Sequence, residues 1–139
     1  MTGKIWRRLP AIIIMVIIFI LSSMPGDLST EESNLVIEAL RAPTTHQVIV
    51  AVRKSAHLIE YAALGASLLL FMDEGRRQAP FDAWLAGMLY GVTDEIHQYL
   101  VPGRSGMISD VFIDSIGCLA GVLVLQLLML IYRKRKRAL

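Results

Sequence analysis

Two stretches of 18 residues, 9–26 and 115–132, contain no charged side chain. As an α-helix each would be about 27 Å long, close to the roughly 30 Å hydrocarbon core of a bilayer. Two further apolar stretches are also long enough to span a bilayer, although each carries charges toward one end. The sequence therefore predicts an all-α integral membrane four-helix bundle. Its helices are expected at about residues 9–24, 46–72, 81–101 and 110–132, in a single domain covering residues 1–139.

Composition agrees with a membrane protein, because 55% of the residues are hydrophobic, against about 45–50% in soluble domains. The basic start and first apolar run also resemble a secretory signal peptide. No small-x-small cleavage site precedes the turn at Met24, Pro25 and Gly26, so we expect the segment to remain as a helix.

Lysine and arginine placement predicts the orientation, since these residues favour the cytoplasmic side. Ten of the 14 basic residues would lie on one side of the stack. They are Lys4, Arg7, Arg8, Arg76, Arg77 and the five in the basic tail, residues 133–139. Both termini are therefore expected in the cytoplasm, with membrane lipids as partners. Because the tail adjoins a spanning helix, we predict no nucleic-acid partner.

The first outer loop, residues 25–45, has its own helical signals. Ser29 and Glu32 fit a capping box, and apolar residues then recur at helical spacing. The sequence predicts a short amphipathic helix at the membrane interface that ends before Pro43.

Ionisable residues interrupt three of the predicted spans, which is costly by about 2.5–3.5 kcal/mol per residue on insertion scales. The second helix would descend, the third ascend and the fourth descend, so every group would lie in the extracytoplasmic half. The members are Arg53, Lys54, His57 and Glu60, then Asp94, Glu95 and His97, then Asp110 and Asp114. We expect them to share one cavity.

Helical spacing supports this expectation, because residues three or four apart share a helix face. Lys54, His57 and Tyr61 follow one stripe, and Gln98 lies one turn after Asp94 and Glu95. On the last helix, Asp110 and Asp114 share a face with a glycine pair, Gly117-x-x-x-Gly121. Small residues at this spacing predict close contact with another helix.

The cluster supports several interpretations. Arginine and lysine would bind phosphate or carboxylate, and a histidine could transfer protons. We predict these ligand-binding residues: Lys54, His57, Tyr61, Asp94, Glu95, Gln98, Arg104, Asp110 and Asp114. His57, Lys54 and Glu95 are the catalytic candidates should a reaction occur.

Two alternatives remain for the cluster. Buried ion pairs that only fix the bundle are one. A metal site is the other, with His57, His97, Asp94, Glu95 and Asp114 as its ligands. Because no compact ligand motif such as HExxH is present, we predict no metal and no cofactor. The lone Cys118 allows no internal disulfide, and we expect it to be buried.

The spaced motifs together resemble the VanZ-like membrane proteins of bacteria over about residues 53–121. They are Lys54-x-x-His57-x-x-x-Tyr61-x-x-Leu64, Asp94-Glu95-x-x-Gln98, and Arg104, Asp110, Asp114, Gly117 and Gly121. Many members of that family have asparagine where this chain has Asp114. The resemblance implies a bacterial cell-membrane location and a link to the cell envelope, since the founding member is associated with low-level teicoplanin resistance. It implies no particular reaction.

Two functions of different class follow. The first is an outward-facing pocket that binds a lipid, a lipid-linked cell-wall precursor or a lipoglycopeptide head group. The alternative is an integral-membrane hydrolase or transferase acting on a phospholipid or polyprenyl phosphate. Arg104-x5-Asp110-x3-Asp114 is similar to the Arg-x5-His-x3-Asp motif of type-2 phosphatidic acid phosphatases, but an aspartate replaces the nucleophilic histidine. The sequence leaves the oligomeric state open.

Overall fold

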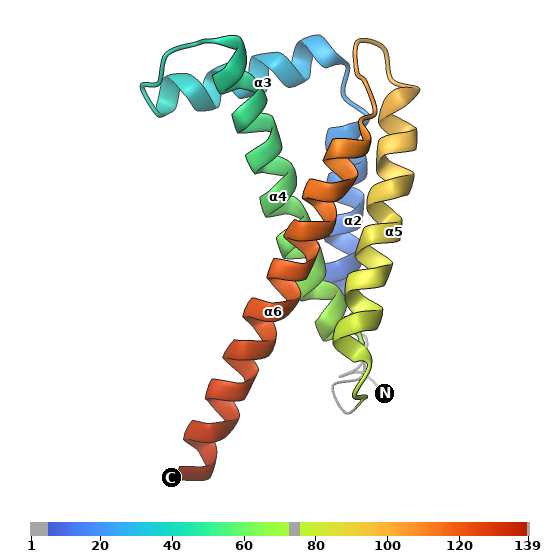
Figure 1. The fold of residues 1–139 in the computed structure, drawn as a ribbon, viewed down its shortest axis with the longest axis vertical. Helices are drawn as coiled ribbons and strands as arrows, with labels where there is room; N and C mark the ends of the chain where they lie inside the picture. Colours follow the sequence, from blue (N-terminus) through green and yellow to red (C-terminus); the bar gives the residue numbers. More distant parts are fainter. Residues whose placement is uncertain (1–5, 73–75, 139) are drawn as a thin grey trace.

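The computed structural model describes residues 6–72 and 76–138. Over these residues the chain is all-helical, which confirms the all-α part of the predicted fold (Figure 1). The helices are α2 (Leu9–Ser22), α3 (Gly26–Ala39), α4 (His46–Phe71), α5 (Ala79–Tyr99) and α6 (Ile108–Ala138). Lys4 of the predicted basic start and residues 73–75 of the segment between the second and third predicted helices lie outside the described residues.

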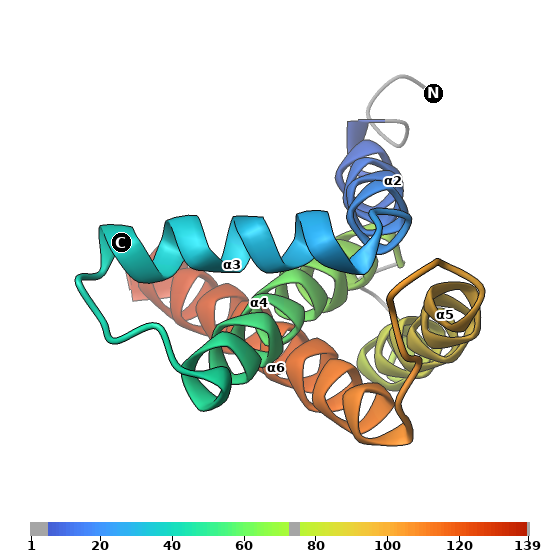
Figure 2. The ribbon, with the colours of Figure 1, turned by 90° about the horizontal axis from the view of Figure 1, so that it is seen from above.

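Four helices run along the long axis of the molecule, and α3 lies across one end (Figures 1 and 2). A short break at Ser23–Met24–Pro25 turns the chain by 109° between α2 and α3. Pro25 favours this break because it has no N–H to continue the hydrogen bonds of α2. Both ends of the described chain lie at the opposite end from α3 (Figure 1).

Two local predictions were wrong. The capping box at Ser29 and Glu32 does not form, because α3 begins earlier, at Gly26, and Ser29 is a buried residue inside the helix. The early start fits a loop contact, in which the Gly26 amide donates to the Pro102 carbonyl oxygen at 3.1 Å. The basic tail is also not separate from the last helix, since α6 continues through it to Ala138. Lysine and arginine are good helix formers, and no glycine or proline interrupts them.

Close backbone contact joins α4 and α6, as the glycine spacing predicts. A Cβ atom added at Gly121 would collide with the Ala62 carbonyl oxygen, and one added at Gly117 would collide with that of Leu58. Gly65 of α4 is equally close to the backbone of Cys118 on α6. Only glycine permits this approach. The crossing therefore brings His57, next to Leu58 on α4, close to Asp114, which lies one turn before Gly117 on α6.

Large apolar side chains are exposed along the molecule, which is unusual for a protein surrounded by water. Ile12, Ile13 and Ile20 of α2 and Leu123 and Val124 of α6 are each at least half exposed. Among the described helices, α6 alone is long and apolar enough to cross a bilayer by itself. Helices α2 and α3 reach that length only as a pair across their bend.

Candidate functional site

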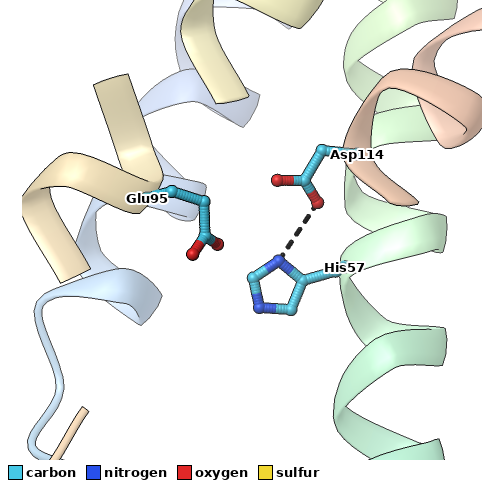
Figure 3. A group of neighbouring side chains, drawn as sticks. All are labelled: His57, Glu95 and Asp114. Carbon is cyan, nitrogen blue, oxygen red and sulfur yellow. Dashed lines mark hydrogen bonds and ion pairs between the residues drawn. The ribbon is translucent and has the colours of Figure 1, made fainter. Parts of the chain in front are cut away.

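Three buried side chains from three helices converge at the centre of the polar cluster (Figure 3). They are His57 of α4, Glu95 of α5 and Asp114 of α6, with exposed fractions of 9%, 5% and 0%. His57 Nδ1 lies 3.2 Å from Asp114 Oδ1. One nitrogen or oxygen atom from each residue lies within 4.8 Å of the other two. Groups 57 residues apart in sequence thus form one site because the α4–α6 crossing is so close.

A second polar group on α5 fixes the position of Glu95. Gln98 Nε2 donates to Asp94 Oδ2 at 2.9 Å and to Glu95 Oε1 at 3.1 Å. The other oxygen of Glu95 accepts from the backbone N–H of Met107 at 2.8 Å. The three-residue and four-residue spacing places these side chains on one helix face. The Glu95 carboxylate is therefore held from two sides before any ligand binds.

Arg104, in the loop between α5 and α6, connects separate parts of the chain. Its Nη1 donates to the Leu21 carbonyl oxygen at 2.7 Å, and its Nη2 donates to Ser29 Oγ at 3.4 Å. Its Nε is buried and has no partner among the described residues. Burial, and then the positive charge of Arg53, lower the pKa of Arg104, which remains a cation because arginine does not deprotonate in proteins.

A cavity of about 400 Å³ adjoins the cluster. Its polar lining is Ser22, Ser29, Glu32, Ser33, Arg53, His57, Glu60, Asp94, Gln98 and Arg104. Its apolar lining is Ile18, Leu21, Leu35, Val36, Val52 and Ala56. The volume falls within the range of small-molecule sites, which combine apolar walls with a few convergent polar groups.

Comparison with known proteins assigns the chain to a family. A family model described as VanZ/LLP1 matches residues 9–130, most of the chain. The chain belongs to the VanZ/LLP1 family. No curated protein and no solved structure matches it. The sequence resemblance is therefore confirmed, and with the exposed apolar α6 it indicates membrane association.

In this VanZ/LLP1 protein the predicted site residues fall into three groups. His57, Asp94, Gln98 and Arg104 line the cavity, whereas Glu95, Asp114 and Tyr61 do not. Tyr61 is fully buried, and its hydroxyl has no partner within the described chain. Lys54 and Asp110 also do not line the cavity. Lys54 Nζ lies 4.0 Å from Asp110 Oδ1, and His57 Nδ1 lies 3.2 Å from Asp114 Oδ1.

The sequence reasoning missed the contribution of α2 and α3 to the cavity. Ser22, Ser29, Glu32 and Ser33 line it, and α3 buries Ser29, Ser33 and Ile37 on one face. Their four-residue spacing is a signal that the sequence contains, but the capping-box interpretation placed Ser29 at the end of the helix. Arg53 and Glu60 were recognised as charged residues of the span, although neither was among the predicted ligands.

His97 lies outside the central group of this VanZ/LLP1 protein. Its Nε2 is 3.0 Å from Ser23 Oγ, and its ring stacks on Phe19 with centroids 4.7 Å apart. It packs α5 against α2 at the end near α3. Within the described chain, one group of three side chains has ligand atoms close enough together to hold a metal ion. It consists of His57, Glu95 and Asp114 and does not include His97.

Proposed function

We propose that this protein is a multi-pass protein of the bacterial cell membrane whose cavity binds the phosphate-bearing head group of a lipid or lipid-linked envelope precursor. The observation that carries the proposal is a pair of cavity arginines. Arg53 Nε and Arg104 Nε are both buried without a partner in the described chain. A buried guanidinium N–H without an acceptor is costly unless an anion accepts from it, and phosphate suits the planar geometry of the group.

The remaining lining supports a head group rather than a free anion. Carboxylates of Glu32, Glu60 and Asp94 also line the cavity, so a ligand with hydroxyl or amine groups beside its phosphate would satisfy both charge types. Apolar side chains of α2, α3 and α4 would contact the start of an acyl or polyprenyl chain. Leu35 and Val36 of α3 and Val52 of α4 suit that role because they line the cavity at the end of the molecule where α3 lies.

The proposal includes the topology. Helices α2, α4, α5 and α6 would form the four-helix membrane bundle, with α3 at the interface and both termini in the cytoplasm. The cavity would then face the extracytoplasmic side, where envelope precursors and glycopeptides meet the membrane. The concentration of lysine and arginine at the end opposite α3 supports this orientation.

Lipid retention tests the proposal. The protein is extracted with mild detergent, and bound lipids are quantified by mass spectrometry for the wild type, Arg53→Ala and Arg41→Ala. Arg41 is a matched control because it is an exposed arginine near the same end and does not line the cavity. Losing charge-assisted hydrogen bonds worth about 1.5–3 kcal/mol should reduce phospholipid retention by roughly 10- to 100-fold in Arg53→Ala. Equal retention in all three proteins would contradict head-group binding in this cavity.

The same proposal predicts that the protein confers teicoplanin resistance on cells. We expect the wild type to raise the inhibitory concentration of teicoplanin in a susceptible host, and Arg53→Ala to lose this effect at equal membrane abundance. Arg41→Ala should keep it. If the wild type does not change the inhibitory concentration of teicoplanin, the resistance function is refuted. Lipid binding is judged by the retention experiment alone.

A hydrolase or transferase acting on a phospholipid or polyprenyl phosphate is the second candidate. It is favoured by the His57–Asp114 pair, in which a carboxylate orients an imidazole beside a cavity. Purified protein is incubated with polyprenyl phosphate, and free phosphate is measured. Turnover that His57→Ala abolishes would support the enzyme, and its absence in the wild type would leave the binding function.

A further inference from the structure

The central group has more buried negative charge than the protein itself balances. Asp94, Glu95 and Asp114 are each at most 5% exposed. Among the described residues, His57 forms an ion pair with Asp114 at 3.2 Å, and the Arg104 cation interacts with Asp94 and Glu95 only through longer-range charge attraction. Removing several carboxylates from water is unfavourable unless a cation compensates them. The cluster therefore has the charge of a cation site.

An unpaired acceptor atom in the group also indicates a cation site. Asp114 is fully buried, and its Oδ2 has no hydrogen-bond partner among the described residues. His57, Glu95 and Asp114 each offer one ligand atom within 4.8 Å of the others (Figure 3). Ligand atoms bonded to one tetrahedral metal at about 2.0–2.2 Å lie roughly 3.4 Å apart, so side chains separated by up to 4.8 Å would move closer together on binding.

The surrounding contacts resemble the outer shell of a metal centre. Gln98 and the Met107 backbone N–H each donate to one oxygen of Glu95 and hold its carboxylate toward the group. Hydrogen bonds of this kind orient metal ligands. Each carboxylate oxygen retains a lone pair for a further bond.

We propose that His57, Glu95 and Asp114 bind one divalent transition-metal ion of the Zn²⁺ or Mn²⁺ type. One imidazole and two carboxylates suit these ions better than Mg²⁺ or Ca²⁺, which prefer oxygen ligands alone. No sequence motif indicates the site because α4, α5 and α6 each supply a single ligand. The inference does not depend on head-group binding, although the site adjoins the cavity through His57.

The test uses full-length protein purified in detergent through a tag without histidine, then stripped with a chelator. Zn²⁺ or Mn²⁺ alone is added, unbound ion is removed by gel filtration, and bound metal is measured by mass spectrometry. We expect one ion per chain for the wild type. Glu95→Gln and Asp114→Asn should each lower the affinity by at least about 10-fold. Mg²⁺ and Ca²⁺ should compete weakly.

His97→Ala is the matched control, because it removes a histidine from the same half of α5 without changing the central group. It should bind metal as the wild type does. Circular dichroism establishes that each variant is helical. Should a variant fail to fold, Mn²⁺-loaded wild type decides the question by electron paramagnetic resonance, where coupling to one imidazole ¹⁴N is expected. Substoichiometric binding by the wild type, absence of ¹⁴N coupling, or equal losses in His97→Ala would overturn the proposal.

Discussion

Gly117→Ala tests whether the backbone crossing of α4 and α6 positions the polar cluster. A Cβ atom at Gly117 would lie 2.5 Å from the Leu58 carbonyl oxygen, whereas ordinary van der Waals contact begins at 3.4 Å. The obstacle is backbone, so no rotamer change relieves it, and the helices would need to separate by about 1 Å in a close-packed interior. The substitution should therefore destabilise the crossing rather than be absorbed locally.

The magnitude follows from two opposing effects. Overpacking costs about 1–3 kcal/mol, and a backbone obstacle should fall in the upper part of that range. The higher helix propensity of alanine offsets about 1 kcal/mol. We expect a net destabilisation of about 1–2 kcal/mol, which lies within the range that single substitutions usually cause. A separation of about 1 Å would also lengthen the 3.2 Å contact between His57 and Asp114 beyond hydrogen-bonding distance.

The assay is reversible unfolding in mixed detergent micelles, followed by circular dichroism. Ile116→Ala is the control, since it introduces alanine at the preceding position, where the side chain is exposed, and should change stability by no more than about 0.5 kcal/mol. A Gly117→Ala protein as stable as the wild type would refute direct backbone contact and the explanation of how the cluster is assembled.

Three further predictions concern other elements. Tyr90→Phe removes a 2.6 Å hydrogen bond to the Met15 carbonyl oxygen and should lower the stability in the same unfolding assay by about 1 kcal/mol, because it weakens the α2–α5 contact. Tyr132 is exposed, so Tyr132→Phe should have no effect, and equal losses in the two variants would contradict the hydrogen bond between Tyr90 and Met15. Cys118 is fully buried and should resist maleimide until the protein unfolds, so rapid labelling of native protein would be evidence against the packing of α6. A reporter fused after Arg137 should be active only in the cytoplasm, and an extracytoplasmic signal would reverse the proposed orientation.

The sequence by itself determined that this chain is helical and where its helices are centred. Uncharged apolar runs, proline and glycine breaks and helical periodicity are local properties, so they do not depend on the rest of the fold. It also indicated the close helix contact at Gly117 and Gly121, because small residues four apart form one flat face. The spaced motifs sufficed to recognise the family, which the comparison confirmed.

Only the tertiary structure decided which polar groups meet. The pairing of His57 with Asp114, and of Lys54 with Asp110, depends on the depth and angle at which α4 and α6 cross, and helical spacing contains neither. The serines of α3 reach the cavity because the chain bends by 109° after α2, a geometry that residues near Pro25 permit but do not specify. Contacts between elements are set by packing against distant neighbours, whereas periodicity describes one element at a time.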